Sequence, residues 1–487
     1  MMRNGHSMER PRRARQASAG NQPREREPSA GKLSRAGLAA LAVGILAGMG
    51  PAAGWAAAER APAARWSIVV VPFAAAGAAA DGVHDALYEV VSHGLRQVRG
   101  LRVLESGATE KAMKATDAPR GVLPADRQLA EVALAAKARL AVGGSVTQEK
   151  DELRLTLRFA DAATRGETAG GEELAGPAGD PFALGGRAAQ VFLKSARAAI
   201  TPLDEKRLAR AFVRPTASLP AYVFYARGRW ALGLGTREGY EWATDFFGKA
   251  LEQDGSFALA RYQLGMALQA TNNRWKAVGE FRKAIQLDPN FAEAYKSLGD
   301  LLRLSPRRLF DQAIESYTKA LDLEPDFAEA YVGRGDAWQA KGNFDHAIAE
   351  YKKALALDPE NALVHVGLGR IFYNEKGQYH EAVTEYNRAI QLDPALLEAH
   401  LALGEVYEEK GLYQEAIARY GKVLEMEPKH PTAHYGLALA YEKVDRAKAI
   451  AMWEQYMEVA TGLASEKDWL DIARKHLTKL KDQPAGR

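Results

Sequence analysis

The residues that could carry out chemistry in this 487-residue chain are few. Three histidines, His365, His400 and His434, follow one another at spacings of 35 and 34 residues and raise the question of a metal site, since imidazole is a common zinc ligand. The chain has no cysteine, which excludes a thiol nucleophile, a cysteine-ligated metal site and a disulfide framework. The closer pair His430 and His434 encloses Pro431, so we expect His430 to precede a helix and the pair to lack the geometry of a metal site.

A second candidate for chemistry is the run Gly143-Gly144-Ser145, which lies where a phosphate-binding loop could lie. Such a loop needs a following helix whose backbone N–H groups cradle the phosphate, and here the next residues predict another strand. We therefore interpret these glycines as structural. His84 and His93 lie nine residues apart in a predicted helix, about half a turn from each other around its axis, and cannot share one metal ion. The sequence predicts no catalytic residue, no metal site and no cofactor.

The spacing of the three histidines has another explanation, an internal repeat. Prolines that follow an acidic residue recur at intervals of 36, 34, 35 and 34 residues: Pro289, Pro325, Pro359, Pro394 and Pro428. The first predicted helix of each unit carries a glycine: Gly265, Gly299, Gly335, Gly369 and Gly404. The second opens with an alanine and has an aromatic residue one turn later: Ala277 and Phe281, Ala313 and Tyr317, Ala347 and Tyr351, Ala382 and Tyr386, Ala416 and Tyr420. This pattern and its period resemble the tetratricopeptide repeat.

The resemblance implies seven repeats over residues 221–462, of which the first and the last are degenerate, and a helix over residues 465–480 that caps the last repeat. In this register the three histidines occupy the position that Tyr295 and Tyr331 hold in neighbouring repeats. We therefore expect them to pack between helices rather than to bind a metal.

The segment from 65 to 203 has a different character, because short apolar runs alternate with amphipathic stretches. We expect strands at 66–73, 101–104, 140–147, 153–159 and 167–174, and helices from 81 to about 100, at 124–137 and at 182–200. This order predicts a small α/β sandwich domain. The strand sequences at 68–73, 101–104, 141–146 and 153–159 resemble the amino-terminal domain of the TolB family and its FlgO-like relatives, which implies a non-catalytic docking or assembly role. The expected fold class is α+β multidomain: an α/β sandwich domain followed by an all-α superhelical solenoid.

The first 58 residues predict export from the cytoplasm. Residues 1–35 carry nine basic and three acidic residues, and we expect them to be a disordered basic region. Residues 36–58 are uncharged, and they contain Ala56 and Ala58, the small-residue pattern of a signal-peptide cleavage site. Cleavage after Ala58 would leave a periplasmic or secreted protein. An uncleaved segment would instead anchor the chain in the inner membrane, with its domains outside the cytoplasm.

The charge balance argues against nucleic-acid binding. The whole chain carries a net charge of +4 and residues 1–35 carry +6, so the remainder carries −2. A slightly acidic folded portion lacks the clustered Lys and Arg that neutralise phosphates.

The repeats point to a protein or peptide partner, because the first helices of such an array line a concave groove that binds extended segments. The candidate contact residues in this groove are Tyr262, Lys296, Arg303, Arg370 and Tyr373. Some repeat proteins of this kind grip a terminal carboxylate with paired Lys and Asn, but Lys296 is followed by Asp300 where that clamp has Asn. We expect a non-catalytic, exported scaffold, and its oligomeric state stays open. The alternatives are an accessory factor that presents clients to an envelope polysaccharide or peptidoglycan enzyme, and a cytosolic regulatory repeat protein.

Overall fold

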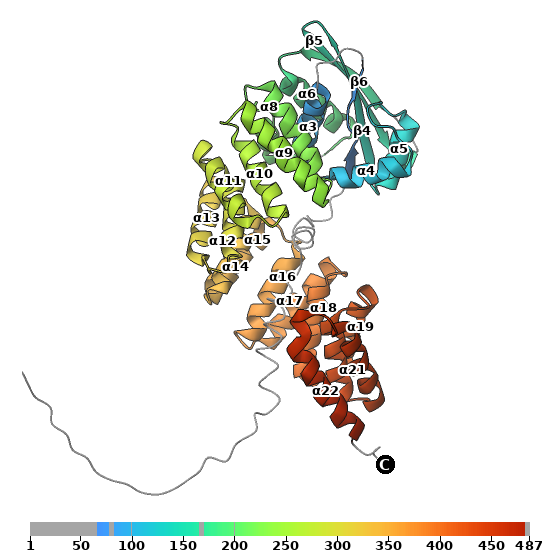
Figure 1. Cartoon of the computed structure of the whole chain (residues 1–487), viewed down its shortest axis with the longest axis vertical. Helices are drawn as coiled ribbons and strands as arrows, with labels where there is room; N and C mark the ends of the chain where they lie inside the picture. Colours follow the sequence, from blue (N-terminus) through green and yellow to red (C-terminus); the bar gives the residue numbers. More distant parts are fainter. Residues whose placement is uncertain (1–65, 77–81, 99, 165–169, 199, 483–487) are drawn as a thin grey trace, which may run out of the picture. The chain divides into compact units, whose positions relative to one another are not determined.

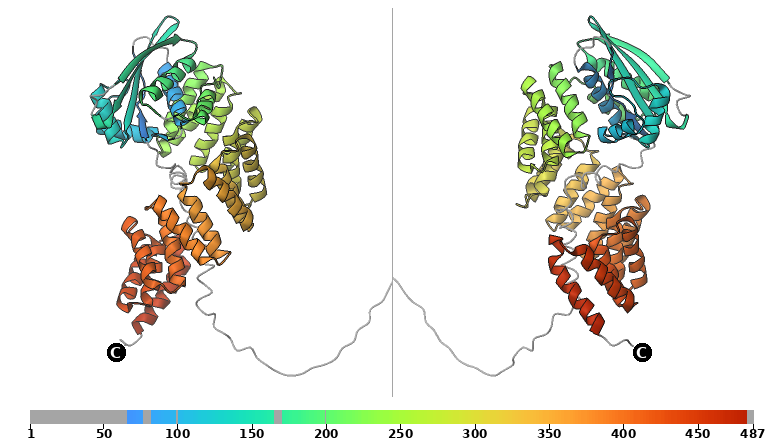
Figure 2. Two further views of the ribbon diagram at one scale, coloured as in Figure 1. Left: turned by 180° about the vertical axis from the view of Figure 1, so that it is seen from behind. Right: turned by 45° about the vertical axis from the view of Figure 1, so that its right-hand side comes forward.

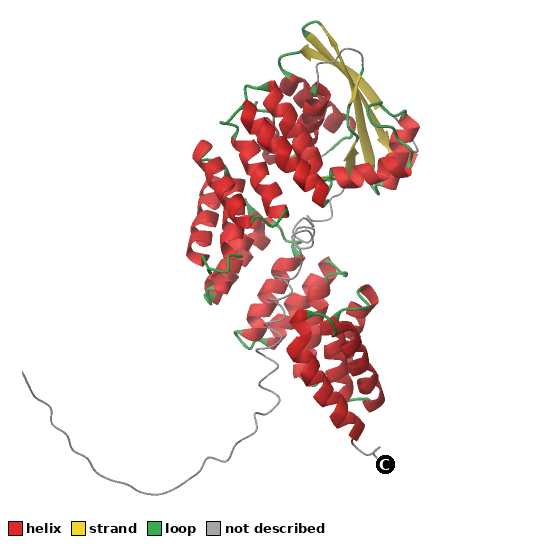
Figure 3. Cartoon of the chain, in the orientation of Figure 1, coloured by secondary structure: helices red, strands yellow, loops and turns green. Residues whose placement is uncertain are grey.

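The computed structural model describes residues 66–76, 82–98, 100–164, 170–198 and 200–482. Within these residues the chain has a mixed sheet with its covering helices, followed by an array of helices (Figures 1 and 3). The predicted basic region and the predicted signal or anchor segment, residues 1–58, lie outside the described residues. Among the described helices, none combines the length and the apolar composition that crossing a membrane requires.

The sheet has the strand order β3-β1-β4-β5-β6. Its strands are β1 (Trp66–Val70), β2 (Ala74–Ala75), β3 (Leu101–Val103), β4 (Leu140–Glu149), β5 (Glu152–Asp161) and β6 (Gly170–Pro177). Strand β1 is parallel to both β3 and β4, and the short β2 extends the sheet beside β4. Strands β4, β5 and β6 form an antiparallel meander. The predicted strands are confirmed, within a few residues of their expected boundaries.

Five helices accompany the sheet: α3 (Val83–Arg96), α4 (Ser106–Ala115), α5 (Asp126–Ala135), α6 (Pro181–Ser195) and α7 (Pro202–Ala211). Alternate residues of β1 divide between two cores, as the period of a strand requires. Ile68 and Val70 join the core that contains residues of α3 and α6. Val69, and Val71 directly after the strand, join the core that contains residues of α4 and α5. Helices on both faces make this region an α/β sandwich.

The sequence did not predict α4 or α7, and its last helix was too long. Helix α4 buries mainly small or polar residues, Ser106, Thr109, Ala112 and Met113, so it lacks a regular apolar pattern. The predicted helix over 182–200 is wrong after Ser195, because the chain turns there with a positive φ of 49° at Arg197. Helix α7 then begins at a capping box between Thr201 and Asp204.

After α7 the described helices form seven consecutive pairs, whose colours run from green to red in chain order (Figures 1 and 2). The pairs are α8 (Leu219–Leu232) with α9 (Arg237–Gln253), α10 (Ala258–Ala270) with α11 (Arg274–Leu287), α12 (Ala292–Arg303) with α13 (Phe310–Leu323), α14 (Ala328–Ala340) with α15 (Phe344–Leu357), α16 (Ala362–Asn374) with α17 (Tyr379–Leu392), α18 (Leu397–Glu409) with α19 (Tyr413–Met426), and α20 (Pro431–Glu442) with α21 (Arg446–Ala460). Helix α22 (Lys467–Asp482) packs against α21 through Ala473, Leu477 and Leu480.

Glycines set the distance between helices in this array. Tyr351 of α15 lies between Gly335 of its own pair and Gly367 of the next, and a Cβ atom on Gly335 would lie 2.7 Å from the tyrosine ring. Gly369 has the same relation to Tyr386, at 2.6 Å. Because real Cβ contacts are longer than this, the aromatic residue of the second helix requires a glycine on the first helix in the first six pairs, whereas the seventh pair has Ala438 at this position. These are the positions that the repeat pattern singled out.

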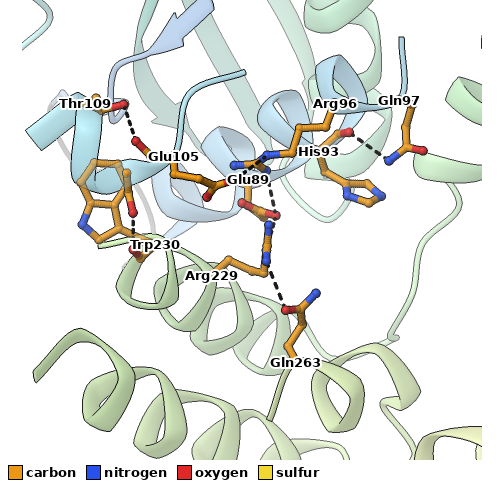
Figure 4. A network of polar contacts seen from close by, with 10 residues as sticks. Glu89, His93, Arg96, Gln97, Glu105, Thr109, Arg229, Trp230 and Gln263 are labelled. Atoms are coloured by element: carbon orange, nitrogen blue, oxygen red, sulfur yellow. Dashed lines mark hydrogen bonds and ion pairs between the residues drawn. The ribbon is translucent and has the colours of Figure 1, made fainter. Parts of the chain in front are cut away.

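A buried polar network joins the α/β region to the first helix pair (Figure 4). The carboxylate of Glu89 on α3 is 1% exposed and lies 3.3 Å from Arg229 of α8 and 3.7 Å from Arg96. Arg229 also donates a hydrogen bond of 3.1 Å to Gln263 of α10. Burial lowers the pKa of the neighbouring His93 to about 4, so this imidazole is neutral at physiological pH. One carboxylate thus holds an arginine from each side of the junction.

Helix α7 makes a second connection between the two regions. Leu208 is buried in the same core as α3 and α6. On the same helix, Arg207 pairs with Asp326 at 3.3 Å and Arg210 pairs with Glu324 at 3.1 Å, both in the turn between α13 and α14. The segment after the sheet is therefore held by the helix array, rather than being a free linker.

Candidate functional site

The three repeat-spaced histidines are structural. His400 and His434 are buried, and the Nε2 atom of each lies 3.1 Å and 3.0 Å, respectively, from the carbonyl oxygen of the turn proline six residues earlier. His365 pairs through Nδ1 with Glu385 at 2.6 Å. His430 precedes α20, as predicted, and its side chain accepts a hydrogen bond from the backbone of the first turn. Within the described ranges, no group of three or more His, Asp or Glu side chains could hold a metal ion.

The glycine run of the α/β region is also structural. Gly143 and Gly144 lie inside β4, which leads directly into β5 rather than into a helix, as the sequence predicts. A Cβ atom on Gly143 would lie 3.0 Å from Leu123, and one on Gly144 would lie 3.1 Å from Phe73. The glycines let the two faces of the sheet pack closely, and no helix terminus is present there to bind phosphate.

The polar residues of the first helices form the candidate site. Two ion pairs, which we call the groove pairs, stand out: Lys296 pairs with Asp300, and Arg303 pairs with Asp336. The first spans one helical turn of α12 at 2.9 Å, and the second links α12 to α14 at 3.5 Å. All four side chains are partly exposed, between 24% and 34%. Burial alone would lower the pKa of Lys296, but the Asp300 carboxylate raises it, so the ammonium group stays charged.

The tyrosines of the second helices hold the carboxylates of the groove pairs from behind. The hydroxyl of Tyr317 donates to Asp300 at 2.6 Å, and that of Tyr351 donates to Asp336 at 2.7 Å. Burial and the adjacent carboxylate raise the pKa of both tyrosines far above the ordinary value, so both remain hydrogen-bond donors. Tyr317 and Tyr351 therefore have two functions: the ring of each packs against glycine, and its hydroxyl orients a carboxylate of the first helix.

The carboxy-terminal part of the array is acidic. We call Glu405, Glu408 and Glu409 of α18 the acidic end. Glu409 accepts hydrogen bonds from the hydroxyls of Tyr373 and Tyr379, and Glu408 accepts one from Tyr420 at 3.2 Å. Burial, with help from neighbouring carboxylates, raises the pKa of Glu405 and of Glu408 to about 7. These two groups therefore change charge near neutral pH.

The five predicted contact residues differ in how available they are. Lys296, Arg303 and Arg370 are 24% to 29% exposed, and Arg370 pairs with Glu398. Tyr373 is only 5% exposed. The ring of Tyr262 packs against Phe281 and Phe291, at centroid distances of 5.6 and 4.9 Å. The structure thus brings Lys296 and Arg303 together with their carboxylates, places Arg370 and Tyr373 near the acidic end, and gives Tyr262 and Tyr373 mainly packing contacts.

Sequence reasoning missed the partners of these residues. The sequence predicted neither the ion pair of Arg370 with Glu398 nor the hydrogen bond from Tyr373 to Glu409, and it predicted no bond from the hydroxyls of the repeat tyrosines. Two signals were available. Tyrosine replaces phenylalanine at four of the five repeat positions, and for three of these tyrosines, Tyr317, Tyr351 and Tyr420, the first helix carries a carboxylate or Gln that bonds the hydroxyl.

The helix array matches known repeat families. Residues 258–291 match the tetratricopeptide repeat family, and residues 310–342, 335–375, 372–411 and 409–445 match the TPR repeat. No curated protein matches the chain.

Solved structures are similar to part of the chain. One reported as the crystal structure of MamA is 30% identical, covers 34% of this chain and 95% of its own, and has a TM-score of 0.31. One reported as YrrB, a TPR protein with an unusual peptide-binding site, is 27% identical, covers 39% of this chain and 97% of its own, and has a TM-score of 0.32. A third structure, MamA residues 41 to the end from Desulfovibrio magneticus RS-1, is 22% identical, covers 37% of this chain and 98% of its own, and has a TM-score of 0.33.

Proposed function

Since the chain belongs to the tetratricopeptide repeat proteins, we propose that it is a non-catalytic scaffold that binds a protein or peptide segment along the first helices of the array. The groove pairs are the observation that carries this proposal. A polar group that is already oriented loses little conformational freedom when a ligand binds, so it contributes more to affinity than a mobile one. The tyrosine hydroxyls supply this orientation for Asp300 and Asp336.

The charges suggest how a partner would lie on the array. The groove pairs present both positive and negative charges, so they suit a polar segment of the partner that carries charges of both signs and free backbone amides. Within the described part of the chain, Glu405 and Glu408 form no ion pair, so the acidic end suits a basic part of the partner. Glu405 makes no hydrogen bond or ion pair with any residue that the structure describes, whereas Glu408 accepts a hydrogen bond from Tyr420, and Glu409 accepts hydrogen bonds from Tyr373 and Tyr379.

We further propose that the scaffold works outside the cytoplasm and that the α/β region is a TolB-like docking domain. The uncharged stretch 36–58 behind a basic region supports export, and the strand sequences support the domain assignment. An accessory role for an envelope polysaccharide or peptidoglycan enzyme fits the same features. A mature amino terminus at Glu59, read by terminal peptide mass spectrometry, is the expected result. An unprocessed cytosolic chain would favour a regulatory role instead.

The groove proposal is tested by affinity capture from native envelope extract with the full chain. We compare the wild type with the double variant Lys296→Gln, Arg370→Gln. Both substitutions remove a positive charge from partly exposed positions of the first helices. The matched control is Lys283→Gln, Lys353→Gln, which removes two charges from i,i+3 pairs on the second helices.

The expected result is a partner that the wild type and the control retain and that the groove variant loses. Equal recovery by all three chains would overturn the assignment of binding to the first helices. Circular dichroism of each chain checks that the variants are folded.

A further inference from the structure

A cavity of about 380 Å³ lies where the α/β region meets the first helix pair. Its walls come from the segment between β1 and β2, from α3, from the turn after α4, and from α8 and α9. Neither region would form this cavity alone. Small-molecule sites are concentrated at such domain junctions, with volumes of roughly 300 to 1,000 Å³ and walls that are mostly apolar.

Aromatic rings form the inner wall of the cavity. Phe73 and Tyr88 meet edge to face at 6.1 Å, and Tyr88 and Trp230 do so at 5.5 Å. The guanidinium of Arg120 lies over the Trp230 ring at 5.7 Å. Trp242 lines the cavity as well, yet it is 53% exposed. Aromatic edges and faces of this kind favour a flat ring as the ligand, because ring pairs add to the energy of simple burial.

The charged groups in and next to the cavity leave a positive balance; of these, Asp85, Arg120 and Arg227 line it, whereas Glu110 and Lys114 do not. Asp85 and Arg227 pair with each other at 2.8 Å, so their charges compensate. Arg120 bonds to Glu110, which also lies 3.6 Å from Lys114. One carboxylate is thus shared by two cations, and this group carries a net charge of +1. A carboxylate on the ligand would neutralise this remaining positive charge by pairing with Arg120, since planar guanidinium groups bind carboxylates well.

We propose that this cavity binds a ligand in which a flat aromatic ring carries a carboxylate a short distance away. The ring enters the aromatic wall, and the carboxylate meets Arg120. The site is separate from the first-helix groove, because none of the five groove candidates lines it. The same chemistry exists in a free aromatic acid and in the carboxy-terminal aromatic residue of a peptide.

The proposal is tested by calorimetric titration of the full chain with three probes that share one ring: 2-naphthylacetate, its neutral amide and 2-naphthylethylamine. The acid is expected to bind tighter than the amide by roughly fivefold, a value reduced for the exposure of Arg120, and the amine is expected to bind more weakly than both. A tripeptide that ends in naphthylalanine, as free acid and as carboxamide, distinguishes the two sources. Tighter binding of the peptide acid than of naphthylacetate assigns the site to a peptide terminus; the reverse order assigns it to a free acid.

Two variants and their matched controls locate the site. Trp242→Ala is expected to weaken binding of naphthylacetate at least fivefold, whereas Trp275→Ala, which removes an equally exposed tryptophan from the next helix pair, leaves it unchanged. Arg120→Gln is expected to abolish the preference for acid over amide, whereas Arg127→Gln, on α5 and outside the cavity, keeps it. Arg120 is 59% exposed, so its substitution leaves the core intact. No binding of the acid, equal losses in a variant and its control, or a stronger affinity for the amine would overturn the proposal.

Discussion

Replacing Gly369 by alanine tests whether the repeat glycines are required for packing. The new Cβ atom would lie 2.6, 2.8 and 3.0 Å from three ring atoms of Tyr386, where ordinary contacts begin at 3.4 Å. The tyrosine is 1% exposed and has little room to move. Overpacking of this kind costs about 2 kcal/mol, and alanine recovers about 1 kcal/mol through its better helix propensity. We expect a net loss of about 1 kcal/mol.

Gly421→Ala is the matched control. Gly421 also lies inside a helix, α19, but a Cβ atom there would have no neighbour within 4 Å. Only the propensity term remains, so this substitution is expected to stabilise the protein by about 1 kcal/mol. Urea unfolding followed by circular dichroism measures both, and the two identical substitutions should differ by about 2 kcal/mol with opposite signs. If Gly369→Ala stabilised the protein as much as Gly421→Ala, the packing account of the repeat would be wrong.

Three further predictions concern the polar groups. Arg229→Met leaves the Glu89 carboxylate buried with only Arg96 nearby and should lower the free energy of unfolding by about 3 kcal/mol. Hydrogen exchange should then show faster exchange of the backbone amides in the α/β region and the first helix pair. Unchanged protection of these amides would contradict the role of the network. Glu405 and Glu408 have pKa values raised from 4.5 to about 7, so the stability that they contribute is complete below pH 4.5 and is lost as the pH rises through 7. The variant with Gln at both positions should lose this part of the pH dependence of the urea midpoint. A pH profile identical to that of the wild type would refute the prediction. Tyr351→Phe removes a hydroxyl that bonds a groove carboxylate and should cost about 1 kcal/mol, whereas no loss would show that the hydroxyl bond is not formed.

The repeat architecture could be predicted from the sequence because its framework residues recur in register. The glycine that faces an aromatic ring recurs at the same position in the first six helix pairs, as Gly335 and Gly369 illustrate. The α/β region was predicted less completely. Helix α4 buries small and polar side chains, so its sequence has no apolar period, and β2 has only two residues.

The candidate sites were harder to predict because they depend on contacts between distant residues. Arg303 pairs with Asp336 of the next repeat, and Arg229 pairs with Glu89, which lies 140 positions earlier in the chain. No local pattern marks such pairs. The cavity at the junction combines side chains from Pro72 to Phe246, and its existence follows from how the α/β region packs against α8 and α9.

Photo-crosslinking from single positions tests the central claim, that a partner binds along the first helices, most directly. A benzophenone amino acid replaces Lys296, which is 27% exposed on a first helix, or Lys353, which is 55% exposed on a second helix. Replacing Lys296 alone leaves Arg303 and Arg370 in place to hold the partner. The account predicts a crosslinked partner from position 296 and none from position 353, although the latter is the more exposed. A product from position 353 alone, or equal products from both, would contradict it.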